Sequence, residues 1–173
     1  MKPVDLVRKL RRDAAFDPAA LDRGKAALMA AIRQEVEPRR RPTIVPQLPY
    51  QDIRAALAFL ERAFGFSEIS TSRLEAQDGV IHHALVEFGD GVIGIGTHGA
   101  HSAISPKSAG VETQYISVRV ADIDAHYERA LAAGARIEHE PRSHSGWRAY
   151  EALDIEGHRW RFLQQLREMP SAR

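Results

Sequence analysis

The chain has 173 residues, a formal net charge of +1 and no cysteine, and 44% of its residues are hydrophobic. These totals fit one globular domain with or without an appendage, and they exclude disulfides, thiolate chemistry and cysteine-based metal sites. No apolar run approaches the roughly 20 residues of a membrane-spanning helix and no apolar leader follows the basic N-terminus, so we predict a cytoplasmic protein.

Residues 1–42 are predicted to form a helical extension that ends in a linker. Asp17-Pro18 supplies a cap followed by proline at the first helical position, apolar residues recur at helical spacing to about Glu37, and the sequence PRRRP at 38–42 ends the pattern. This part carries a charge of +5 and the remainder −4. We favour packing on the body or on a second copy; contact with another partner or a nucleic acid through the basic face is the alternative.

Residues 43–167 contain one pattern of elements twice, and residues 168–173 are predicted to be a tail. The first module, 43–98, has the expected strands 43–49, 66–74, 80–88 and 91–97 and a helix over 53–64. The second module, 113–165, has the expected strands 113–120, 136–140, 147–153 and 158–163, and a helix that begins at Asp122 or Asp124 and ends at Gly134. Each module therefore reads βαβββ, and the Ser/Gly/Pro-rich segment 99–112 links the two.

The final hairpin carries the most informative motif of the chain. Asp154, Gly157, His158 and Trp160 form a turn followed by an aromatic, alternating strand. This hairpin resembles the closing hairpin of the vicinal oxygen chelate superfamily, which contains glyoxalases, bleomycin-resistance proteins and extradiol dioxygenases. Ile155 departs from the proline that is common there. The segments AFGF at 63–66, VADID at 120–124 and AGA at 133–135 add to the resemblance.

The resemblance implies an α+β fold in which two βαβββ modules form a cupped, mixed sheet of eight strands. The helices would lie outside this sheet and a cleft would lie inside it. Superfamily members commonly pair through sheet edges or exchanged modules, so the resemblance also implies a homodimer.

Metal-using members of this superfamily hold their ion at four equivalent strand positions, typically with His and Glu. By register, those positions fall on Val45, Gly94, Tyr115 and Arg161 in this chain. Valine and glycine have no donor side chain, and arginine is a permanent cation that would repel an ion. A register shifted by one residue offers no better set. We therefore predict no metal site and no cofactor.

Strand alternation predicts which side chains face the cleft. Aromatic rings can stack on a flat ligand and arginines can pair with an acid, so we predict a site for an aromatic or acidic small molecule. The predicted ligand-binding residues are Gln47, His98, Tyr115, Arg119, Trp147, Tyr150 and Arg161. Ordinary packing is the alternative interpretation for Trp147 and Tyr150.

The favoured function is therefore a metal-independent, small-molecule-binding protein. A lyase, isomerase or dioxygenase with a histidine-based or non-standard metal site is the first alternative, and a ligand-sensing interaction protein is the second. Adjacent histidines in a strand point to opposite faces, so His82 and His83 cannot chelate one ion together. The near-neutral charge favours neither nucleic acid nor membrane as a partner. Candidate bases are His82, His83, Tyr115, Tyr150 and Glu151, and candidate non-standard metal ligands are His98, His101 and His144.

Overall fold

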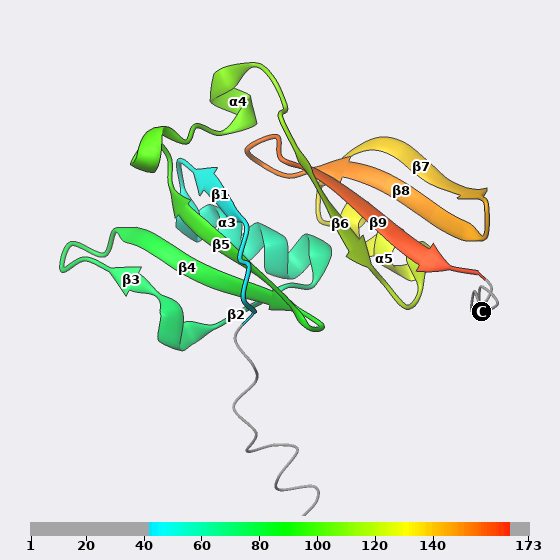
Figure 1. Ribbon diagram of the computed structural model, residues 1–173, viewed down its shortest axis with the longest axis horizontal. Coiled ribbons are helices and arrows are strands. Elements are labelled where there is room, and N and C mark those ends of the chain that lie inside the picture. Colours follow the sequence, from blue (N-terminus) through cyan, green and yellow to red (C-terminus); the bar gives the residue numbers. More distant parts are fainter. Residues whose placement is uncertain (1–41, 167–173) are drawn as a thin grey trace, which may run out of the picture. The chain divides into compact units, whose positions relative to one another are not determined.

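The computed structural model of the protein describes residues 42–166 (Figure 1). Residues 42–166 belong to one compact unit. The predicted helical extension, apart from Pro42, and the predicted tail lie outside the described residues. In the part of the chain that is described, no helix is long and apolar enough to cross a membrane.

The first module forms a five-stranded sheet, which we call sheet A. Its strand order is β1 (Gln47–Tyr50), β5 (Gly91–Thr97), β4 (Ile81–Phe88) and β2 (Ser67–Glu68), and β3 (Leu74–Glu75) also pairs with β4. The sequence predicted one strand over 66–74, but the 3₁₀ turn η2 (Ser70–Ser72) separates β2 from β3. The Ser72 hydroxyl donates to the Ile69 carbonyl and accepts from the Leu85 N–H, so a side chain replaces the backbone ladder there.

The second module forms a four-stranded sheet, which we call sheet B. Its strand order is β6 (Tyr115–Arg119), β9 (Arg159–Gln165), β8 (Trp147–Leu153) and β7 (Arg136–His144). The β6–β9 pair is parallel, like the β1–β5 pair of sheet A, and the other pairs are antiparallel. The predicted α+β class and βαβββ modules are confirmed. Hydrogen bonding divides the strands between two sheets of five and four rather than one continuous sheet of eight.

One helix covers one face of each sheet. The helix α3 (Ile53–Phe59) continues as the π-helical turn η1 (Leu60–Phe64), and α5 (Ile123–Ala132) is its counterpart in the second module. The Asp52 side chain caps α3 and the Asp122 side chain caps α5. In Figure 1 both helices lie behind the sheets, so the described elements leave the opposite faces bare.

The Ser/Gly/Pro-rich segment 99–112 was predicted to link the modules. It contains two short helical elements, η3 (Ala100–Ser102) and α4 (Pro106–Ala109). Proline at the first helical position and Gly110 in the left-handed region fit the short α4 helix.

A single core joins the two modules behind the sheets. The ring of Phe64, at the end of η1, contacts the rings of His126, Trp160 and Phe162 from the second module. His126 is a buried member of α5, whereas Leu131, an apolar residue of the same helix, is 47% exposed. The buried face of α5 therefore includes His126. Because His126 is polar, the spacing of apolar residues along the helix does not indicate that it is buried.

His126 also joins the modules by hydrogen bonds. Its Nε2–H donates to the Phe64 carbonyl at 3.1 Å, which leaves Nδ1 to accept from the Tyr150 hydroxyl at 2.6 Å. Burial lowers the pKa of His126 to about 4, and it raises the pKa of Tyr150. The imidazole is therefore neutral in the folded protein at neutral pH.

The closing hairpin is held to the first module through Asp154. Its buried carboxylate accepts hydrogen bonds from the Tyr50 hydroxyl of β1 at 2.5 Å and from Trp160 Nε1 at 2.9 Å. The N–H groups of Glu156 and His158 donate to its second oxygen, both at 3.0 Å. Burial, followed by the neighbouring Asp154 carboxylate, raises the pKa of Tyr50. The turn thus forms around one carboxylate whose two oxygens are both satisfied.

Candidate functional site

The bare face of sheet B carries a cavity of about 600 Å³. Every residue that lines it belongs to one of the four strands of sheet B or to the turn between β7 and β8. The lining residues are Ser117, Arg119, His139, Glu140, Arg142, His144, Ser145, Trp147, Ala149, Tyr150, Glu151, Arg161 and Leu163.

Cross-strand register places one polar residue from each strand in a single row across the cavity. Ser117 of β6 pairs with Arg161 of β9, Arg161 pairs with Glu151 of β8, and Glu151 pairs with His139 of β7. Directly paired residues share one face of a sheet, so their side chains can interact. His139 Nδ1 lies 3.4 Å from Glu151 Oε2, and Arg161 Nε lies 3.9 Å from Glu151 Oε1.

The neighbouring row is apolar in the middle and cationic at both ends. Leu163 and Ala149 pair with each other at its centre, Arg119 pairs with Leu163, and Arg142 pairs with Ala149. Trp147 lies on the far side of this row, and the Arg119 guanidinium carbon lies 5.7 Å from the centre of its ring. A flat ligand would thus find an apolar floor, an aromatic ring and two guanidinium groups.

Two irregularities in the pairing of β7 bring His139 into the polar row. The pairing shifts between Ile137 and His139, and again between His139 and Arg142. Ile137 packs against the core, so regular alternation would put Glu138 on the bare face and His139 on the helix side. The bulge inserts one residue and turns His139 toward Glu151 instead. Sequence reasoning missed His139 because alternation, its main signal, assigns this residue to the other face.

Glu151 is fixed by a second arginine beside the row. Arg159 donates to Glu151 Oε2 at 3.0 Å from Nη1, and its Nε and Nη2 donate to Glu112 at 2.5 and 3.0 Å. These bonds, the one to Glu112 above all, raise the pKa of Arg159. Arg159 therefore pairs with carboxylates of the protein. Among residues 42–166, Arg161 makes only the 3.9 Å approach to Glu151, and its side chain is 45% exposed.

The bare face of sheet A holds a smaller polar pair. Gln47 lies over Gly94, its register partner in β5, and a Cβ at position 94 would collide with the Gln47 amide. Glycine therefore allows this amide to cross the strand and reach His83, whose Nε2 lies 3.2 Å from Gln47 Oε1. His98 lies just past β5, where its Nδ1 accepts from the Ser105 N–H at 3.2 Å.

The predicted site residues therefore fall on two separate faces. Arg119, Trp147 and Arg161 line the sheet B cavity, whereas Gln47 and His98 belong to the first module. Tyr115 is 56% exposed and is not among the residues that line this cavity.

The Tyr150 side chain contributes to the lining of the cavity but is otherwise packed in the core. It is 1% exposed, bonds His126 and stacks on Phe162, its register partner. Alternation along β9 places Phe162 on the helix side, and Tyr150, which pairs directly with it, shares that face.

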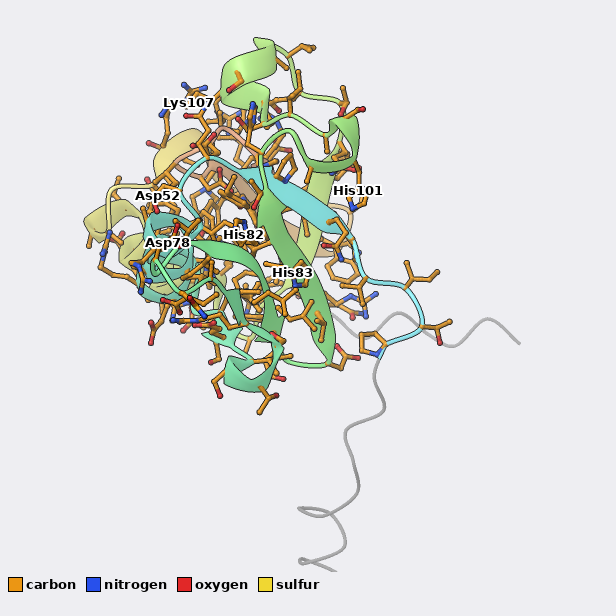
Figure 2. The ribbon with its side chains drawn as sticks, turned by 90° about the vertical axis from the view of Figure 1, so that its left-hand side faces the viewer. Asp52, Asp78, His82, His83, His101 and Lys107 are labelled. Atoms are coloured by element: carbon orange, nitrogen blue, oxygen red, sulfur yellow. The ribbon has the colours of Figure 1, made fainter. Side chains whose placement is uncertain are left out.

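The histidines suggested as non-standard metal ligands do not meet. Figure 2 shows His101 in the loop after β5, apart from His82 and His83 on β4. Within residues 42–166, no group of three or more His, Asp or Glu side chains lies close enough together to hold a metal ion. Of the four positions that the resemblance assigned to a metal, Gly94 lies beneath Gln47 and Arg161 places a cation in the cavity, whereas Val45 precedes β1 and Tyr115 does not line the cavity.

Comparison with known proteins gives a consistent family assignment. Residues 43–162 match the model of the glyoxalase/bleomycin resistance protein/dioxygenase superfamily. The crystal structure of TioX from Micromonospora sp. ML1 is similar, with a TM-score of 0.61 and 34% identity over 73% of this chain and 100% of that one. An uncharacterised protein of Mycobacterium bovis is 27% identical over 133 residues, 74% of this chain and 86% of its own.

More distant solved structures share the fold alone. A bleomycin resistance determinant encoded on the transposon Tn5 has a TM-score of 0.54 and 20% identity, over 75% of this chain and 100% of that one. The fosfomycin resistance protein FosX from Mesorhizobium loti has a TM-score of 0.52 and 17% identity, over 72% and 92%.

Proposed function

This chain belongs to the glyoxalase/bleomycin resistance protein/dioxygenase superfamily, and from that premise we propose that it binds an aromatic, acidic small molecule without a metal ion. The observation that carries the proposal is the sheet B cavity, where Arg161 and the Arg119–Trp147 pair border the apolar floor of Leu163 and Ala149. Its volume of about 600 Å³ lies within the range of small-molecule sites.

The charge balance of the cavity supports an acidic ligand. Glu151, a carboxylate in its middle, already pairs with Arg159, so it does not neutralise Arg161. A carboxylate on the ligand would bind Arg161 in the two-pronged geometry that guanidinium favours, and a ring would rest on the floor against Trp147. Metal independence is supported by the residues at the four family positions, Val45, Gly94, Tyr115 and Arg161.

A homodimer would bring the two bare faces together. Gln47 and His98 belong to the first module and do not line the sheet B cavity, and a second chain that places its sheet A over this cavity would bring both sets into one site. We propose that sheet A of one subunit covers the cavity on sheet B of the other, in a cytoplasmic dimer.

A matched pair of ligands tests the binding proposal. We expect 3-phenylpropionate to bind and to change the fluorescence of Trp147, and 3-phenylpropanol, which lacks the charge, to bind more weakly. Arg161→Gln should weaken binding of the acid about tenfold, or 1.4 kcal/mol, and leave binding of the alcohol unchanged. Calorimetry measures both affinities. The variant Trp147→Phe shows whether the fluorescence change comes from Trp147 or from Trp160, which is buried in the core.

Two controls accompany this titration. Arg54→Gln removes an exposed guanidinium of the first module that pairs with Glu75, and it should not affect either ligand. A chelator should leave the affinity for the acid unchanged. Equal affinity for acid and alcohol, or binding that disappears with the chelator, would contradict the proposal.

A further inference from the structure

The polar row across sheet B contains the parts of a proton-transfer site. We propose that His139 is a general base for a carbon acid bound in this cavity, that Glu151 positions it, and that Arg161 binds the negative charge of the substrate. This inference rests on the proposed binding function and adds a reaction to it.

The first argument is the geometry of the His139–Glu151 pair. Glu151 Oε2 lies 3.4 Å from Nδ1 of His139, and a carboxylate at this position favours the tautomer with the proton on Nδ1. The lone pair is then on Nε2, the nitrogen directed away from Glu151. The His139 side chain is 60% exposed and lines the cavity, so Nε2 is accessible to a bound molecule.

The second argument is that the protein holds this carboxylate in place before any ligand binds. Arg159 donates to the same oxygen of Glu151 at 3.0 Å, and Glu112 holds Arg159 from the other side through two hydrogen bonds. A positioned carboxylate that orients an imidazole is the arrangement that general-base histidines require. The bulge in β7 places His139 opposite Glu151, and bulges are frequent beside active sites.

The third argument identifies the class of substrate. Arg161 and His139 flank Glu151 in the row, so their backbones are two strand spacings apart, about 10 Å. Two long side chains across that distance can reach a carboxylate and a carbon one or two bonds away from it. Together with the floor beside Trp147, this spacing fits a 2-oxo acid that carries an aryl group on C3.

The reaction balances without another reactant. The C3–H bond breaks and its proton passes to Nε2 of His139. The electron pair of that bond forms the C2–C3 double bond of an enolate, and the negative charge develops on the C2 oxygen, where Arg161 stabilises it. The imidazolium then returns a proton to C3 or to the oxygen, which regenerates the base and gives the keto or the enol form.

Deuterium incorporation at C3 of phenylpyruvate in D₂O, followed by proton NMR with the full-length protein, tests the inference. The wild-type protein should exchange C3 hydrogens faster than buffer alone. His139→Gln should lower kcat about 100-fold or more, the usual contribution of a general base. Glu151→Gln should lower kcat and leave KM nearly unchanged, because it weakens the base and not the binding of the acid group.

The control is His101→Asn, which removes an exposed histidine outside the cavity at a left-handed backbone position that asparagine also adopts. Its exchange rate should equal that of the wild type. If phenylpyruvate binds but His139→Gln exchanges as fast as the wild type, or if the wild type gives no exchange above buffer, the inference is overturned and the binding function stands. If neither phenylpyruvate nor 3-phenylpropionate binds, both proposals fail together.

Discussion

His126 shows how much of this structure rests on one neutral side chain. Its imidazole donates to a carbonyl of the first module and accepts from Tyr150 of the second, and the bond from Tyr150 requires the uncharged form with its lone pair on Nδ1. Because burial lowers its pKa from 6.5 to about 4, the unfolded chain takes up this proton first as the pH falls. The stability that is present above pH 6.5 is therefore lost progressively down to about pH 4.

We expect protonation of His126 in the unfolded chain to lower the free energy of unfolding by about 3 kcal/mol as the pH falls through that range. The measurement is urea denaturation at pH 7.5 and at pH 4.5 for the wild type and for His126→Gln, whose amide can donate to Phe64 but does not titrate. Glu75, whose pKa is lowered by Arg54 and Arg73, contributes acid sensitivity to both proteins, so the difference between them isolates His126. Equal losses in the two proteins would refute the assignment.

At the scale of an element, the closing hairpin depends on both oxygens of Asp154. Asp154→Asn replaces one acceptor oxygen with an NH₂ group, which is a donor. In one orientation of the amide this NH₂ group faces the two backbone N–H groups, and in the other it faces the donors of Tyr50 and Trp160. We expect a loss of about 2–4 kcal/mol of unfolding free energy, measured by urea denaturation at pH 7.5. Tyr50→Phe, which removes one of the four bonds, should cost about 1 kcal/mol. Equal losses in both variants would contradict this account of the turn.

Elements are also the scale at which sequence and structure differ most clearly. The bounds of β5 and β8 agree with the sequence because glycines and turn residues mark their ends. The Ser72 hydroxyl bonds that divide the second strand, and the bulge that turns His139, depend on pairing with other strands. Periodicity along one strand carries no signal for such pairing, so it places Arg161 on the bare face and assigns His139 to the opposite face.

At the scale of the whole molecule, the two bare faces predict where a complete site is assembled. The cavity is lined by sheet B, and Gln47 lies on sheet A. If each site combines sheet A of one subunit with sheet B of the other, the variants Gln47→Ala and Arg161→Gln should each bind 3-phenylpropionate about tenfold more weakly, or 1.4 kcal/mol. A heterodimer of the two variant chains would hold both changes in one site and none in the other.

Co-expression with two different tags and purification on both gives that heterodimer. We expect about half of its sites to bind with wild-type affinity, because symmetry places the two changes together in a single site. Calorimetry measures the number of tight sites per dimer, and sedimentation equilibrium measures the dimer itself. If all sites of the heterodimer bind as weakly as those of the two parent variants, both residues belong to a site within one chain. If the protein is a monomer at micromolar concentration, the proposal of a shared site fails.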